Sequence, residues 1–134
     1  MTAVLVCVPK QHIRQIWPLV ADRLHMAVKR TDLAHSRDIE ADVCDGNARL
    51  WLACEGDTIE AAATTLLVRT DRNLVCVISA CGGSNLANWL PLLAQIEAWA
   101  KAEGAAKVRI FGRIGWAEVL ENYDVTNVVL ERQL

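Results

Sequence analysis

The sequence predicts a mixed α/β fold in which helices pack on both faces of one mostly antiparallel central sheet. Apolar residues recur at helical spacing over residues 13–28 and again over 89–103. Between these helices the pattern changes to that of strands at residues 48–55, 58–69 and 74–81, joined by short polar turns. Three consecutive strands with tight connections form an antiparallel meander, so we expect a sheet that is mostly antiparallel.

Length and composition indicate a single folded domain spanning residues 1–134. Apolar residues make up 53% of the chain and charged residues 22%, which favours a packed core over disorder. The net charge of −2 gives no reason to expect nucleic acid, and no apolar run reaches the ~18–20 residues of a membrane span. Because no basic leader precedes the first apolar segment, we expect a cytoplasmic protein whose five cysteines are free thiols rather than disulfide or metal ligands.

The first third of the chain predicts a strand at residues 3–8 followed by two helices. The first helix covers residues 13–28 and contains Pro18, which is expected to kink or split it because proline lacks a backbone N–H. A shorter helix is expected at residues 36–44, with Ser36 as its N-cap.

After the meander, the sequence predicts a strand, a loop, a helix and a second strand. The strand at residues 74–81 leads into a small-residue loop at 81–85, and a helix follows at 89–103 with Asn88 as its N-cap. A second apolar strand is expected at residues 107–111. The unpaired N–H groups at such a helix start can hold a phosphate or a carboxylate.

The remainder of the chain predicts a turn, a short helix at residues 117–122 and a closing strand at 125–132. The whole order of elements is therefore β-α-α-β-β-β-α-β-α-β.

Several short stretches match one known family when they are taken together. They are Trp17-Pro18-Leu19-Val20, Leu50-Trp51-Leu52-Ala53, Gly82-Gly83, Ile96-Glu97-Ala98-Trp99-Ala100, Gly112-Arg113 with Gly115-Trp116, and Val129-Leu130-Glu131. With the order of elements, they resemble the GNAT superfamily of acetyl-CoA-dependent N-acyltransferases, and more narrowly small GNAT-like proteins of tailed phages and prophages. The resemblance implies a splay between the strands at 74–81 and 107–111 that admits the pantetheine arm of acetyl-CoA or another acyl-CoA.

The family's pyrophosphate loop, written [QR]-x-x-G-x-[GA], is degraded in this chain. Aligned without gaps, its three defining positions fall on Ser84, Ala87 and Trp89, so the basic or amide residue and the glycines are missing. A shifted alignment that uses Gly82 and Gly83 restores part of the glycine-containing phosphate-binding loop, but it makes this loop longer.

Candidate cofactor-binding residues cluster around this loop. They are Gly82, Gly83, Ser84, Asn85, Ala87 and Arg113. The loop residues are either an anion-binding nest of backbone amides or a plain strand-to-helix connection. The Arg113 guanidinium is either a phosphate ligand or part of a structural ion pair.

The catalytic roles of the family are poorly filled. The strand at residues 74–81 contains no acid or histidine, so Glu60 is a weak candidate for the base, against the alternative of an exposed strand residue. The family's thiolate-protonating tyrosine aligns with Leu120, which leaves Tyr123 as a weak substitute.

Two hypotheses follow from these observations. In the first, the protein transfers an acetyl group from acetyl-CoA to an unidentified small-molecule or protein amine. In the second, it is a catalytically silent GNAT-fold accessory protein of phage propagation. Neither hypothesis requires a metal ion or a membrane, and both are compatible with a homodimer or with a phage protein as partner.

Overall fold

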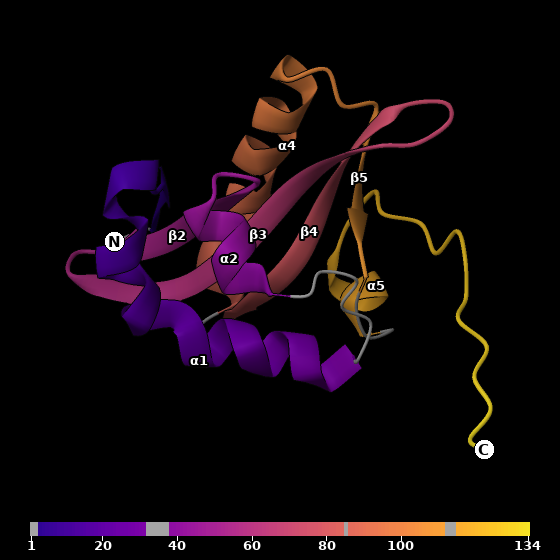
Figure 1. Ribbon diagram of the computed structural model, residues 1–134, viewed down its shortest axis with the longest axis horizontal. Coiled ribbons are helices and arrows are strands. Elements are labelled where there is room, and N and C mark those ends of the chain that lie inside the picture. The colour runs from indigo at the N-terminus through magenta and orange to yellow at the C-terminus, as the bar shows by residue number, and fades with distance from the viewer. Residues whose placement is uncertain (1–2, 32–37, 85, 112–114) are drawn as a thin grey trace.

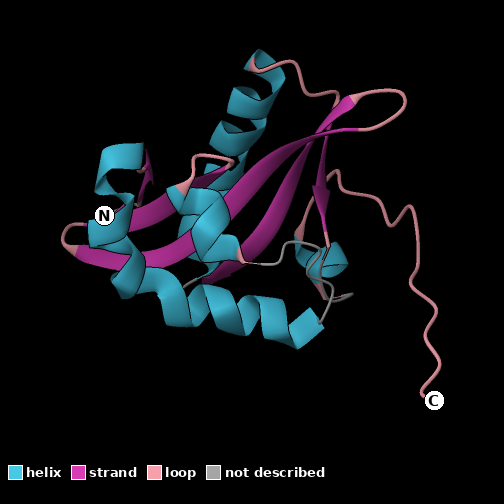
Figure 2. Cartoon of the chain, viewed as in Figure 1, coloured by secondary structure: helices cyan, strands magenta, loops and turns pink. Residues whose placement is uncertain are grey.

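The computed structural model describes residues 3–31, 38–84, 86–111 and 115–134 of the chain. Its core is one five-stranded sheet with the strand order β1-β2-β3-β4-β5 (Figures 1 and 2). The strands are β1 (Val4–Cys7), β2 (Ala48–Glu55), β3 (Thr58–Arg69), β4 (Leu74–Gly83) and β5 (Lys107–Ile110). The first four strands pair antiparallel and β5 pairs parallel to β4, so the expected mixed, mostly antiparallel fold is confirmed.

Helices cover both faces of this sheet, as Figure 1 shows. Their bounds are η1 (Lys10–His12), α1 (Ile13–Thr31), α2 (Ile39–Cys44), α3 (Leu86–Trp89), η2 (Leu90–Leu92), α4 (Leu93–Ala102) and α5 (Trp116–Val119). The helices α1 and α2 pack with strands β2 and β3 around the fully buried Val20, Leu24 and Leu50. On the opposite face, Trp89 and Leu92 pack against alanines of β2 and β3.

The two N-terminal helices confirm the expected kink at Pro18 and depart from the expected N-cap. Pro18 lies inside α1 without splitting it, and the helix axis instead changes direction along its length (Figure 1). This is the expected effect of a proline that removes one helical hydrogen bond. The N-cap of α2 is Asp38 rather than Ser36: the Asp38 carboxylate accepts hydrogen bonds from the backbone N–H groups of Glu40 and Ala41. Ser36 lies outside the described residues.

Two β-bulges interrupt the regular pairing of the sheet. In the β2–β3 pair, Ala53 lies opposite Ala61 and Cys54 opposite Ile59, which leaves Glu60 as the extra residue. In the β3–β4 pair the extra residue is Ser79. Bulges bend a strand and redirect side chains. Both bulges lie toward the end of the sheet where β4 stops.

The C-terminal part of the chain differs from the sequence expectation. Helix α5 ends at Val119, and the expected closing strand at residues 125–132 is wrong, because those residues have no regular structure. Residues 124–134 are exposed and leave the body of the molecule as an extended tail, drawn in yellow in Figure 1. A strand is stabilised by its hydrogen-bonded neighbour, and this segment pairs with none of the strands in the described part of the chain.

Candidate functional site

The strands β4 and β5 part before β4 ends. Their parallel pairing covers four residues and stops where Ile78 lies opposite Ile110. Beyond that point β4 continues from Ser79 to Gly83, pairing only with β3. Figure 1 shows the two ribbons diverging from a common end. The splay begins at Ile78, next to the bulge at Ser79, so one edge of β4 is left without a strand partner among the described residues.

The two glycines expected in a loop are instead part of β4. Gly82 lies opposite Ala62, and Gly83 lies opposite Ala61. A Cβ atom on Gly82 would lie 2.8 Å from the backbone oxygen of Arg23 in α1. A Cβ atom on Gly83 would lie 2.5 Å from the Ala61 Cβ atom. The expected loop at 81–85 is thus wrong for these residues, and their small size lets α1 and β3 approach β4.

The helical segment after β4 starts earlier than the sequence indicates. It begins at Leu86, continues through η2 and ends with α4, so Asn88 lies inside it and is not its N-cap. Ala87 is exposed in its first turn, and Asn85 lies outside the described residues. The Ser84 N–H donates to the Glu60 carbonyl oxygen at 2.9 Å. The N–H groups left for an anion are therefore those of the first helical turn.

Trp89 closes the connection between β4 and the helix. Its indole N–H donates to the Ser84 carbonyl oxygen at 2.6 Å. The centroid of its ring lies 6.4 Å from that of Trp116, so the two tryptophans bring the end of α3 and the start of α5 together.

A pair of carboxylates next to this connection is the feature that the sequence did not reveal. The Asn88 side-chain amide donates to Glu55 Oε2 at 2.9 Å and to Glu60 Oε2 at 2.8 Å. Glu60 is only 6% exposed, which corrects the alternative of an exposed strand residue. Its burial follows from the bulge, which turns it toward α3. The one hint of this pair in the sequence is that Glu55 and Glu60 lie on either side of the turn at residues 56–57, so the two strands could bring them together.

Tyr123 is held at a different place. Its hydroxyl donates to Glu97 Oε2 of α4 at 2.6 Å. Burial first, and then the adjacent Glu97 carboxylate, raise the pKa of Tyr123 above its ordinary value. A phenol with a raised pKa keeps its proton at neutral pH, and here that proton is shared with Glu97. The arrangement anchors the chain after α5 to α4.

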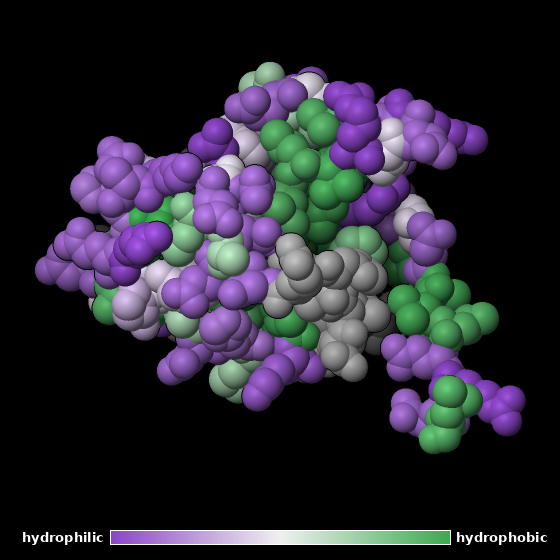
Figure 3. Space-filling model, in the orientation of Figure 1, coloured by the Kyte–Doolittle hydropathy of each residue, from purple (hydrophilic) through white to green (hydrophobic). Residues whose placement is uncertain are grey.

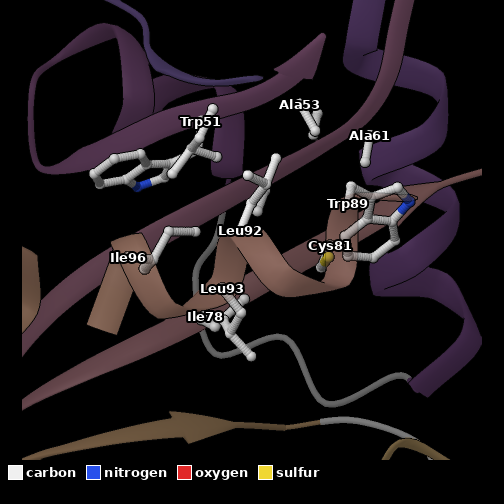
Figure 4. Close-up of a pocket in the computed structure, with 12 residues that line it drawn as sticks. Trp51, Ala53, Ala61, Ile78, Cys81, Trp89, Leu92, Leu93 and Ile96 are labelled. Carbon is white, nitrogen blue, oxygen red and sulfur yellow. The ribbon is translucent and has the colours of Figure 1, made fainter. Parts of the chain in front are cut away.

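An apolar cavity lies between the sheet and the helices α3 to α4. Figure 4 shows Trp89, Leu92 and Ile96 facing small residues of the sheet, with Cys81 at one end. The further lining residues are Leu5, Trp51, Ala53, Ala61, Ala62, Ala63, Ile78 and Leu93. The volume of this cavity is about 40 Å³, which is room for about three water molecules. The cavity as it stands does not accommodate a cofactor arm.

Alkaline pH is expected to destabilise the fold through the thiols of Cys76, which is buried, and Cys81, which is half-buried. Burial raises the pKa of Cys76 to about 11 and that of Cys81 to about 12, from an ordinary value of 9.0. The stability that the protonated thiols contribute is complete below pH 9.0 and is lost as the pH rises through about 11 and 12. Urea unfolding at about pH 8 and about pH 10.5 should show this loss. The Cys81→Ala variant should lose less unfolding free energy between these two pH values than the wild-type protein. An equal loss in both proteins would contradict a contribution of the Cys81 thiol.

Arg113 lies outside the described residues, so its expected role in phosphate binding stays a prediction. Within the described ranges, no group of three or more His, Cys, Asp or Glu side chains is placed to hold a metal ion. Likewise, none of the described helices combines the length and apolar character of a membrane span.

Comparison with known proteins relates the whole architecture to solved acetyltransferases. No protein-family model and no curated protein sequence matches the chain. An aminoglycoside acetyltransferase from an uncultured soil metagenomic sample, in complex with sisomicin, has a TM-score of 0.68 at 11% identity, over 99% of this chain and 97% of that one. A second aminoglycoside acetyltransferase from an uncultured soil metagenomic sample has a TM-score of 0.71 at 11% identity, over 100% of this chain and 98% of that one.

A third similar structure is a GNAT family acetyltransferase from Staphylococcus aureus. Its TM-score is 0.63 at 13% identity, and the similarity covers 100% of both chains. At such identities the likeness concerns the fold alone. Together with the strand order and the parting of β4 and β5, it shows that this chain has the GNAT fold.

Proposed function

We propose that the protein is an acyl-CoA-dependent N-acyltransferase of the phage type. It binds the cofactor along the edge of β4 that faces away from β3 and, beyond Ile78, has no strand partner among the described residues. The observation that carries this proposal is that β4 extends from Ser79 to Gly83 beyond its last pair with β5. A strand edge with free N–H and C=O groups can hydrogen-bond the amides of a pantetheine arm, as an added strand would. The first turn of α3 supplies backbone N–H groups for the pyrophosphate.

The pyrophosphate loop of this proposal differs from the family pattern. The residues proposed to face the cofactor's phosphates are Ser84, Asn85, Ala87 and Arg113, with Gly82 and Gly83 shaping the end of the strand. Glycine is absent from the loop itself, so phosphate binding would depend on the helix start and on Arg113 rather than on a glycine-rich cradle. We therefore expect acetyl-CoA or another acyl-CoA to bind more weakly than in a complete loop.

Thermal unfolding with acetyl-CoA tests this binding directly. A ligand that binds only the native state at about 100 times its Kd stabilises it by about 2.7 kcal/mol. For a domain of this size, the melting temperature should rise by roughly 5–10 °C. Pantetheine alone should give part of this rise if the β4 edge binds the arm. No shift with millimolar acetyl-CoA would contradict the proposal.

The position of the phosphates is tested by a charge at Ser84. Ser84→Glu places a carboxylate beside the first turn of α3 and should reduce the stabilisation by acetyl-CoA, because like charges repel. Ser84→Ala is the matched control, since it removes the exposed hydroxyl without adding charge. Gln11→Glu adds the same charge in η1 and should leave the shift unchanged. Equal shifts in all variants would exclude this phosphate position.

A second candidate function is a catalytically silent accessory protein of phage propagation. The observation that favours it is that both candidate acid–base groups have structural partners: Glu60 accepts a hydrogen bond from Asn88, and Tyr123 donates one to Glu97. An assay for the release of free CoA thiol from acetyl-CoA, in the presence of a panel of amines, distinguishes the transferase from the accessory protein. Binding without thiol release supports the accessory protein, and amine-dependent release supports the transferase.

A further inference from the structure

The apolar cavity between the sheet and the helices α3 to α4 has one wall of small side chains. Ala53 of β2 and Ala61 and Ala63 of β3 line it, and all three are buried. Figure 4 shows Leu92 and Ile96 of the helical layer opposite this wall, whereas the view of the whole surface in Figure 3 shows the outside of the molecule. Alanine is too short to fill the gap between the two layers, so the cavity of about 40 Å³ follows from these residues.

The lining of this cavity suits aliphatic carbon better than water. A buried water makes about three hydrogen bonds to polar groups, whereas an apolar cavity stays dry and accepts apolar guests. The indole N–H of Trp51 at the wall already donates to the Thr65 hydroxyl at 2.9 Å, and the thiol of Cys81 is only a weak donor. Room for about three water molecules is therefore room for about three aliphatic carbons.

The cavity reaches the point where β4 and β5 part. Ile78 lines the cavity, and it is also the last residue of β4 that pairs with β5. Leu93 of α4, which is half-buried, also lines the cavity and is drawn near Ile78 in Figure 4. From Ile78 the edge of β4 that lacks a strand partner among the described residues runs over Ser79 to Gly83, toward the start of α3. The inner end of this edge therefore borders the cavity.

The chemistry of an acyl-CoA relates this cavity to the acyl group. The phosphates lie at one end of the pantetheine arm and the acyl group at the other. With the phosphates at the start of α3, the acyl group comes to the inner end of the β4 edge, next to Ile78. On the basis of the function proposed above, we propose that the cavity binds the acyl chain, and that the preferred donor carries about three aliphatic carbons beyond its carbonyl, as butyryl-CoA does. The pantetheine arm itself stays outside the cavity, on the strand edge.

The primary experiment measures the dissociation constants of acetyl-CoA, butyryl-CoA and succinyl-CoA for the full chain by isothermal titration calorimetry. Butyryl-CoA should bind roughly tenfold more tightly than acetyl-CoA, because it buries additional methylene groups. Succinyl-CoA has as many acyl carbons as butyryl-CoA but ends in a carboxylate, which is costly to bury among apolar side chains. It should therefore bind no more tightly than acetyl-CoA.

Two variants change the size of the cavity in opposite directions. Ala63→Val fills part of the cavity and should remove the advantage of butyryl-CoA, while acetyl-CoA still binds. Leu93→Ala enlarges the cavity from a half-buried position and should move the preference to hexanoyl-CoA. Ala98→Val is the matched control, since Ala98 is exposed on α4; it should keep the wild-type preference. The melting temperature of each variant without ligand shows that it is folded, and Leu93→Ala decides if Ala63→Val does not fold.

The outcomes separate this inference from the function on which it rests. Equal affinities of the wild-type chain for acetyl-CoA and butyryl-CoA would overturn the binding of the acyl chain in the cavity and leave cofactor binding at β4 intact. A preference for butyryl-CoA that the folded Ala63→Val and Leu93→Ala variants retain unchanged would also overturn it, because the acyl chain would then bind elsewhere. If none of these acyl-CoA molecules binds, the proposed function fails and this inference fails with it.

Discussion

Replacing Gly83 by alanine is expected to destabilise the protein by about 3 kcal/mol. An added Cβ would lie 2.5 Å from the Ala61 Cβ atom and 2.6 Å from its Cα atom. Neither atom can move without shifting β3, because Gly83 and Ala61 are paired in the sheet. If Gly83 were in a flexible loop instead, the same change would stabilise the protein by about 0.4–1 kcal/mol through the unfolded state. The sign of the effect therefore tests the placement.

The free energy of unfolding from urea titration is the measurement for this variant. Gly115→Ala is the matched control, because a Cβ atom there meets nothing within 4 Å and its backbone is right-handed helical with φ −56°. It should change stability by less than about 0.5 kcal/mol. A Gly83→Ala protein as stable as the control would show that the glycine is not sterically required.

Replacing Asn88 by aspartate is expected to cost about 3 kcal/mol near neutral pH. The native amide donates to both Glu55 and Glu60, whereas an aspartate would face them as a third acceptor with the same negative charge. Because Glu60 is buried, water screens this repulsion poorly.

Asn127→Asp makes the same chemical change in the exposed tail, where the native side-chain amide donates a hydrogen bond to the neighbouring Thr126 hydroxyl. It should leave the unfolding free energy nearly unchanged, and the difference between the two variants isolates the effect of the carboxylate pair. An Asn88→Asp protein as stable as the Asn127→Asp protein would contradict a role of the Asn88 hydrogen bonds to Glu55 and Glu60 in the stability of the fold.

The elements that local pattern determines were predicted well from the sequence. The strands β2 and β3 have the expected bounds, because their runs of apolar residues and the short 56–57 turn define them without reference to the rest of the fold. The positive φ of Gly56, +60°, is what that turn requires. The order of elements up to β5 was also predicted, and with it the parting of β4 and β5.

Features that depend on what lies across the sheet could not be predicted in this way. Two adjacent glycines are typical of a loop, and only the approach of Arg23 and Ala61 explains why they belong to β4. Glu60 has a charged side chain on a strand, and only the bulge explains its burial against Asn88. The tail has the pattern of a strand, but a pattern does not supply the neighbour that a strand needs.

The position of β1 has a consequence for the order in which the molecule folds. Val4 lies opposite Cys54, whereas the meander of β2, β3 and β4 joins neighbours through short turns. Contacts between residues close in sequence form fast, and contacts that close a long loop lose more chain entropy before they gain energy. Although β1 precedes the meander along the chain, it is therefore expected to be among the last strands to join the sheet.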